Sequence, residues 1–167
     1  SHYTFNGLAI NPATAGTYGM LSTSLSHRSQ WIGFEGAPVY NVFSIHTPLK
    51  DSRTGLGLLA LNESAGLRRQ TGLYLNYAHR LTMGRATLSL GLKAGISLGA
   101  FEQVETGYDD FLYNENALKF ILPNFGIGAL YYTQKFHAGI SVPSILGYKA
   151  GNDGNIIPYH DFSRYAL

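Results

Sequence analysis

The chain has 167 residues, of which 45% are hydrophobic and 13% aromatic, and its 12 Lys and Arg nearly balance its 10 Asp and Glu. Soluble domains carry about 25% charged residues, whereas this chain carries 13% and has no cysteine. These values exclude a nucleic-acid-binding arm, an acidic tail, a disulfide scaffold and a thiolate zinc site. A compact soluble β-protein and a transmembrane barrel remain.

The N-terminal residues 1–5 do not show the basic and then apolar order of an export signal, so we expect that signal to be absent or already removed. After them, apolar and small or polar residues alternate in four segments, and three less regular segments at residues 17–28, 38–48 and 55–62 are also predicted to be strands. Period two is the pattern of a β-strand, and it is clearest over residues 86–100. The predicted strands cover residues 17–28, 38–48, 55–62, 72–81, 86–100, 125–131 and 136–142.

Each strand is predicted to have one apolar face and one face of small side chains. In the clearest strand, Leu88, Leu90, Leu92 and Ile96 share one parity. We expect this parity to face lipid and the other to face the interior of a barrel. The interior set contains a column of glycines, which either leaves room for an occupant, such as the chain's own N-terminal segment or a passenger, or relieves strain in a curved wall. These glycines are Gly91, Gly95, Gly99, Gly126, Gly128 and Gly139.

The connections between strands alternate in length. Residues 50–53, 82–85 and 133–135 are short, whereas residues 29–37, 63–69 and 101–121 are longer. Bacterial barrels have short periplasmic turns and long external loops, and a tilted strand of about ten residues spans their apolar band of about 25 Å. The sequence therefore predicts an all-β fold, an antiparallel transmembrane β-barrel. Its parts are residues 1–16 in the periplasm or lumen, strands in 17–142, and an extracellular loop segment in 143–167.

Aromatic residues gather at the predicted strand ends. We interpret them as an interfacial girdle, in which a ring is half buried and its hydroxyl is wet. The alternative is the ordinary preference of tyrosine for sheets. The residues are Tyr74, Tyr77, Tyr131, Tyr132 and Phe136.

Sequence motifs indicate no catalytic or metal site. Ser97 stands in a G-x-S-x-G pattern, but hydrolases need that serine on a strand-to-helix turn and here it lies within a strand. The six histidines lack metal-ligand spacing, and Asp109, Asp110 and residues 152–155 are typical of solvated loops. We predict no enzymatic activity and no cofactor. A membrane hydrolase that uses Ser97 is a rival, and a Ser97→Ala variant would test it.

Several stretches resemble the PorP/SprF family, outer-membrane proteins of the type IX secretion system in Bacteroidetes. The first contains the run Asn11-Pro12-Ala13-Thr14-Ala15-Gly16, with Thr14 where the family usually has tyrosine. The resemblance covers nearly the whole chain, and its order and spacing are specific. The stretches are residues 3–16, 28–33, 36–38, 54–58, 90–95, 123–128 and 139–143.

The resemblance implies a bacterial outer-membrane barrel of about fourteen strands, of which this chain supplies the N-terminal seven. It also implies binding, anchoring or export of a secreted surface protein or adhesin through that protein's C-terminal domain. Contacts with periplasmic secretion and gliding components and with outer-membrane lipid are expected, and none with nucleic acid. The residues carried over as partner-binding are Asn11, Pro12, Ala15, Gly16, Arg28, Gln30, Trp31, Gly36, Ala37 and Pro38.

Other accounts stay open at this point. The carried-over residues equally suit structural pinning of the first loop into the barrel mouth. A passive channel or hydrophobic-solute transporter is the alternative function, and it predicts solute flux without a partner and a lumen lined by charge, for which Arg80 and Lys93 are the candidates. A soluble lipocalin-like binder would be extracted without detergent.

Overall fold

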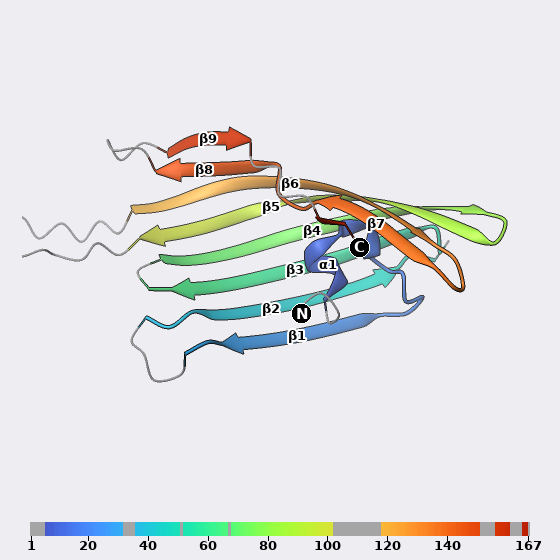
Figure 1. Ribbon diagram of the computed structural model, residues 1–167, viewed down its shortest axis with the longest axis horizontal. Helices are drawn as coiled ribbons and strands as arrows, with labels where there is room; N and C mark the ends of the chain where they lie inside the picture. Colours follow the sequence, from blue (N-terminus) through green and yellow to red (C-terminus); the bar gives the residue numbers. More distant parts are fainter. Residues whose placement is uncertain are drawn as a thin grey trace, which may run out of the picture.

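Antiparallel strands curl into half of a barrel (Figure 1). The computed structural model describes residues 6–31, 36–50, 52–66, 68–101, 118–150, 156–160 and 165–166. The predicted all-β, antiparallel fold is confirmed. Seven strands pair with one another in the order in which they occur in the chain. They are β1 (Ser22–Ser29), β2 (Val39–Pro48), β3 (Thr54–Ala65), β4 (Arg68–Met83), β5 (Ala86–Phe101), β6 (Leu118–Tyr132) and β7 (His137–Val142).

Three shorter strands follow β7. β8 (Leu146–Ala150) and β9 (Ile156–His160) form a separate pair, and β10 (Tyr165–Ala166) pairs with β7. Residues 143–167, expected as a loop segment, therefore contain strands. The backbone N–H of Ile145 donates a hydrogen bond to the Phe125 carbonyl at 2.8 Å, so this part of the chain adds to β6 where β7 has ended. An extracellular position for it stays a prediction.

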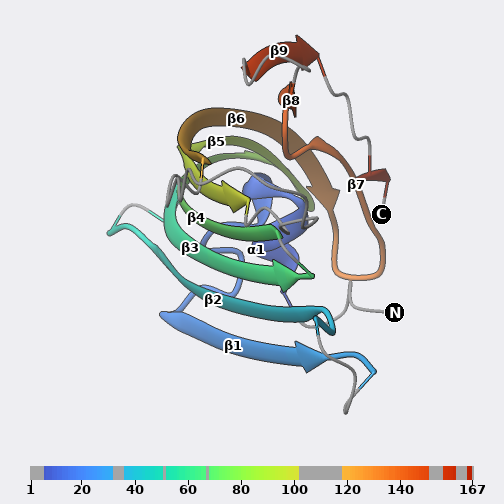
Figure 2. The same cartoon turned by 90° about the vertical axis from the view of Figure 1, so that its left-hand side faces the viewer.

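The two faces of the sheet differ as the alternation predicts. On β4, Leu73 and Leu75 are 49% and 67% exposed, whereas Tyr74 and Asn76 between them are buried. β5 repeats the pattern with exposed Leu90, Leu92, Ile96 and Leu98. The exposed apolar side chains lie on the convex face of the curl, and the buried ones lie on the concave face, which Figure 2 shows wrapped around the N-terminal helix.

Two predicted boundaries were wrong. The connection expected at residues 63–69 is a tight turn, because β3 and β4 stay paired up to Ala65 and Arg68, and Gly66 supplies the positive φ (58°) that such a turn needs. The polar residues Glu63 and Ser64 had indicated a loop, although they are paired strand residues. The first strand begins at Ser22 instead of residue 17, because Thr17 and Gly19 hydrogen-bond back into the preceding turn.

The long connection predicted at residues 101–121 ends earlier than expected, because β6 begins at Leu118. Residues 102–117, with Asp109 and Asp110, lie outside the described residues, as do residues 152–155.

The N-terminal segment (residues 6–16) lies inside the curl. It contains a single helical turn, α1 (Gly7–Ile10), and a 3-10 turn, η1 (Pro12–Thr14). Asn11 begins η1 by accepting the Ala13 N–H, and Pro12 stands at the first position of the turn, where its missing N–H costs nothing. In the described part of the chain, no helix has the length and apolar character to cross a membrane.

Candidate functional site

A row of small residues crosses the concave face and forms the floor of the site. The strand register places these residues opposite one another from β3 to β7. We call them the small-residue row: Gly55, Ala78, Gly91, Gly128 and Ser141.

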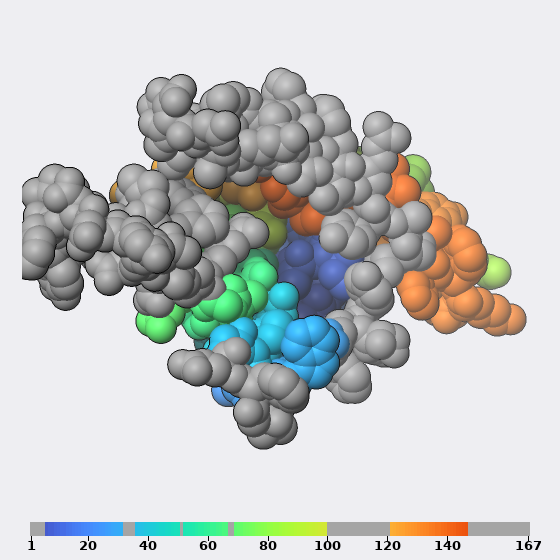
Figure 3. All heavy atoms as spheres, turned by 60° about the vertical axis from the view of Figure 1, so that its left-hand side comes forward, coloured from blue at the N-terminus to red at the C-terminus, as the bar shows by residue number. Residues whose placement is uncertain are grey.

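The N-terminal segment sits directly on this row. A Cβ atom on Gly91 would collide with the backbone of Ala13, and one on Gly128 would collide with the Asn11 side chain. Figure 3 shows the N-terminal segment, in blue, at the bottom of a hollow between the cyan and green strands and the orange ones. Glycine is therefore needed here because the two backbones approach closely.

Asn11 ties the segment to the far strands of the sheet. Its side chain is fully buried, and its Nδ2 donates to the carbonyl oxygens of Ala129 at 3.1 Å and Ile140 at 3.4 Å. Its Oδ1 accepts the Ala13 N–H at 2.9 Å. One side chain thus joins η1, β6 and β7.

Arg80 and His46 hold the other end of the segment. Arg80 Nη2 donates to the Ala15 carbonyl and Nη1 donates to the Ser52 carbonyl, each at 2.9 Å. The Gly16 N–H donates to Nδ1 of His46 at 3.0 Å, so that ring nitrogen carries no proton.

Two serines complete the attachment. Ser89 Oγ donates to the Ala13 carbonyl, and Ser141 Oγ donates to the Ile10 carbonyl, each at 2.7 Å. Buried carbonyl groups need such donors, because an unmet polar group in an apolar site is costly. The segment is therefore fixed along its length by side chains from β2, β4, β5 and β7.

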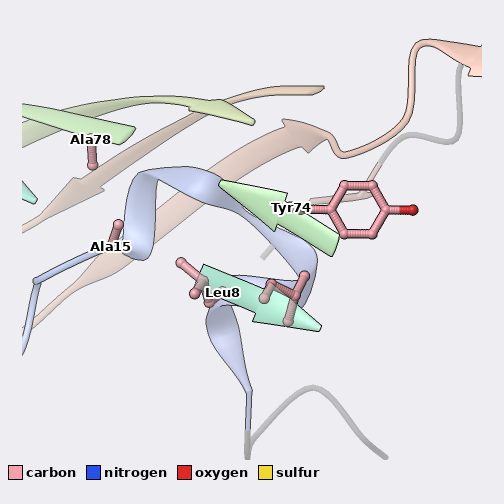
Figure 4. Close-up of a cluster of buried hydrophobic side chains, with 5 residues drawn as sticks. Leu8, Ala15, Tyr74 and Ala78 are labelled. Atoms are coloured by element: carbon pink, nitrogen blue, oxygen red, sulfur yellow. The ribbon is translucent and has the colours of Figure 1, made fainter. Parts of the chain in front are cut away.

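Apolar contacts seat the helical turn (Figure 4). Leu8 is 1% exposed and packs with Leu59 of β3, while Ala15 packs with Ala78 of β4. Tyr74 belongs to the same cluster and is 4% exposed. The prediction that placed Tyr74 in an interfacial girdle was wrong, because its even position turns it to the concave face.

Trp31 marks a second region, at the end of β1. Its side chain is 73% exposed, and its φ of 53° is left-handed, which is uncommon for a bulky residue. Arg28 lies three residues before it. In one orientation of the Gln30 amide, the amide oxygen accepts a hydrogen bond from Arg28 Nε at 2.7 Å.

Backbone hydrogen bonds fix both sides of this region. The Gln30 N–H donates to the Pro38 carbonyl at 3.0 Å, and the Gly66 N–H donates to the Gly36 carbonyl at 2.9 Å. The second bond joins the β1–β2 connection, which includes Ala37, to the β3–β4 turn.

The ten carried-over residues therefore form two groups. Gly16 lies beside Pro48, at one end of β2, and Gln30 is bonded to Pro38, beyond the other end. β2 has 10 residues, so at about 3.3 Å per residue the groups lie roughly 33 Å apart. Nothing brings them into one site.

Four residues that hold the N-terminal segment were missed as site residues: His46, Arg80, Ser89 and Ser141. Arg80 had drawn attention only as a charge in the lumen. All four occupy the inward parity of their strands, and a polar side chain there needs a partner inside the curl. The inward position of these polar side chains could be predicted from the sequence. Their partner could not, because it depends on where residues 6–16 lie in the fold.

The concave face offers little that could support hydrolysis or metal binding. Ser97 lies within β5, and its Oγ accepts a hydrogen bond from Gln70 Nε2 at 2.7 Å. Among the described residues, no group of three or more His, Asp or Glu could hold a metal ion.

Comparison with known proteins gives a family. No curated protein and no solved structure matches the chain. Residues 1–166 match the family described as "Type IX secretion system membrane protein PorP/SprF". The match runs through the N-terminal segment, the curled sheet and the residues after it. This chain belongs to the PorP/SprF family of type IX secretion system membrane proteins.

Proposed function

We propose that this chain is part of an outer-membrane barrel that binds a partner surface protein from outside and anchors it or helps its export. In this role the protein is not an enzyme: it supplies a wall in the membrane and a docking surface. Family membership supports a place in type IX secretion. A link to periplasmic components of the same machinery is part of the proposal.

The convex face supports contact with lipid. Leu75, Leu92 and Ile121 are 67%, 57% and 67% exposed, on β4, β5 and β6. A contiguous exposed apolar surface on several strands is unfavourable in water and suits the apolar band of a membrane barrel. β4 and β5 have 16 residues each, more than the roughly ten that cross this band when tilted.

The observation that carries partner binding is the exposed Trp31 beside Arg28. Tryptophan and arginine are the residue types most enriched at the energetic centres of protein interfaces. Backbone hydrogen bonds hold Gln30, directly before Trp31, to Pro38, and Gly66 to Gly36. An exposed anchor on a fixed backbone loses little entropy on binding.

The second group of carried-over residues has a different role in this proposal. Asn11, Pro12, Ala15 and Gly16 hold the N-terminal segment on the small-residue row, so they would affect a partner only through the shape of the lumen. The partner-binding surface is then the Trp31 surface, made of Arg28, Gln30, Trp31, Gly36, Ala37 and Pro38.

Affinity isolation from membranes in mild detergent tests the proposal. We expect the tagged protein to recover one secreted surface protein, identified by mass spectrometry, and the Arg28→Ala/Trp31→Ala variant to lose it. A matched control changes Met83 and Arg85 to alanine, since they are an exposed apolar residue and an arginine at the opposite end of the strands. If both variants recover the surface protein equally well, or if neither recovers it, a docking role for Trp31 is contradicted.

The passive channel is distinguished by a second measurement. Reconstituted protein without a partner should show no steady conductance in planar bilayers, because the N-terminal segment lies on the concave face. Steady conductance, unchanged by the Trp31 variant, would support the channel instead.

A further inference from the structure

Beside the small-residue row, the next row of the concave face carries two polar side chains that do not hold the N-terminal segment. The register sets Gly57, Asn76, Lys93 and Gly126 opposite one another on β3 to β6. Asn76 and Lys93 are therefore direct cross-strand neighbours, and such neighbours have Cβ atoms about 4.5–5.5 Å apart.

Asn76 is buried with both amide atoms unpaired, and the largely buried Lys93 side chain beside it donates to no described residue. Asn76 is 2% exposed, and neither its Oδ1 nor its Nδ2 is bonded. Lys93 is 7% exposed, and its Nζ lies 4.3 Å from the centre of the Tyr74 ring. No hydrogen bond to a described residue accompanies this cation–π contact. Since buried polar groups are nearly always bonded, the two unpaired amide atoms of Asn76, next to an ammonium group that donates to no described residue, point to a bound acceptor.

Groups with no hydrogen to donate close the two flanks of this pair. Leu8 fills the space over Gly57, with its Cδ2 2.9 Å from where a Cβ would stand, and the Pro143 backbone fills the space over Gly126, with its carbonyl oxygen, which can only accept, nearest. The Tyr74 ring covers Lys93. The Leu8 side chain and the Tyr74 ring lower the local dielectric on their sides of the pair, which strengthens the attraction of an ammonium group for an anion.

Among the residues that the structure describes, no acidic side chain lies close to Lys93. The described residues include one acidic side chain, Glu63, which stands six residues along β3 from Gly57, or about 20 Å. The other concave cation, Arg80, already donates to the Ala15 and Ser52 carbonyls. Within the described part of the chain, Lys93 therefore has no counter-ion.

We propose that Asn76 and Lys93 form a binding site for a carboxylate on the concave face. Lys93 supplies the charge and one donor, and the Asn76 amide supplies the second donor, so the two oxygens of a carboxylate are met side by side. The carboxylate comes either from a small free acid or from a polypeptide in the lumen, through its C-terminus or an acidic side chain. This site is separate from the Trp31 surface and does not depend on partner binding there.

The test follows the side-chain NMR signal of Lys93 in the full chain, in detergent micelles with ¹³C-labelled lysine. The signal is assigned from its loss in Lys93→Met. Sodium acetate is added against sodium chloride at equal ionic strength, and a short peptide with a free C-terminal carboxylate is added against its amidated form. We expect acetate or the free-carboxylate peptide to shift the Lys93 signal to saturation. Chloride and the amidated peptide should bind with at least tenfold lower apparent affinity.

The two probes separate the sources. Saturation by acetate but not by the peptide assigns the site to a small free acid, whereas saturation by the peptide assigns it to a polypeptide carboxylate. An equal response to chloride, or no response to either carboxylate, overturns the proposal.

Two variants of Asn76 sharpen the test. Asn76→Leu keeps the size and removes the donor, so acetate should bind at least tenfold more weakly. Asn76→Asp places a carboxylate beside Lys93, so the Lys93 signal should start near its acetate-saturated position and stop responding. Lys135→Met, at the exposed β6–β7 turn, is the control and should leave the Lys93 shift unchanged.

Thermal unfolding without ligand adds a readout that a merely structural Asn76 would not give. Because unpaired buried polar groups destabilise a fold, Asn76→Leu should raise the unfolding temperature while it weakens acetate binding. A lower unfolding temperature together with unchanged acetate affinity in both Asn76 variants would overturn the proposal.

Discussion

The two ends of β2 present the two groups of carried-over residues, and the groups differ in where their polar and apolar atoms go. At the Pro48 end, the N-terminal segment directs its hydrogen bonds into the chain, to Arg80 and His46 among others. At the Pro38 end, the backbone is fixed but the Trp31 side chain is 73% exposed. A shared family pattern can thus combine residues that build the fold with a residue, Trp31, whose side chain is exposed.

Gly91→Leu should have the largest effect on this contrast. The leucine side chain needs the space of the Ala13 backbone, and such overpacking costs up to about 3 kcal/mol. We expect the N-terminal segment to leave the small-residue row and the free energy of unfolding, measured by urea titration in micelles, to fall by about that amount. Ala94→Leu, on the exposed convex face of the same strand, is the control. If both variants lose the same free energy of unfolding, the N-terminal segment does not bind to the small-residue row.

Arg80→Met should come next. It removes the donors to the Ala15 and Ser52 carbonyls, and hydrogen bonds to charged groups contribute about 1.5–3 kcal/mol. The same titration should show a loss of about 2 kcal/mol. Arg85→Met, exposed in the β4–β5 turn, should stay within about 0.5 kcal/mol. If Arg80→Met and Arg85→Met are equally stable, Arg80 does not help to hold the N-terminal segment.

His46→Leu should have a smaller effect, because it removes one acceptor from the Gly16 N–H. A typical hydrogen bond contributes about 1 kcal/mol. His46→Asn offers an oxygen near the position of Nδ1 and should keep most of the stability. If the leucine variant is as stable as the asparagine variant, this hydrogen bond does not hold the segment.

Trp31→Ala should have the smallest effect on stability, within about 0.5 kcal/mol, since it changes an exposed side chain. Its effect on partner recovery should be large, at least tenfold, measured by quantitative mass spectrometry of the affinity-isolated material. A loss of stability above about 1 kcal/mol with unchanged recovery would reverse the contrast between the two ends of β2.

Much of the sheet was predictable because strand residues alternate strictly. The parity of Leu88–Ile96 in β5 assigned its convex and concave faces, and four of the seven predicted strands followed from the same period, whereas the first three came from less regular segments. Boundaries were harder. Glu63 and Ser64 are polar and indicated a loop, but their backbones pair with β4 and the chain turns at Gly66.

The site was only half predictable. The glycines of β5 and β6 indicated a shallow interior wall, yet the sequence left open whether an occupant or curvature explained them. The answer depended on residues 11–16, whose hydrogen-bond partners on the strands lie 30 to 129 positions further along the chain. Such long-range contacts leave no local pattern, and the unpaired state of Asn76 and Lys93 was equally invisible before their neighbours were placed.

The reach of Asn11 has a consequence for the order of folding. Its side chain bonds to carbonyl groups 118 and 129 positions later, and contacts between residues so distant in sequence form slowly. Until β6 and β7 have paired, those acceptors are not in place. The N-terminal segment therefore docks on the concave face among the last events of folding. Its docking requires that β6 and β7 are already paired.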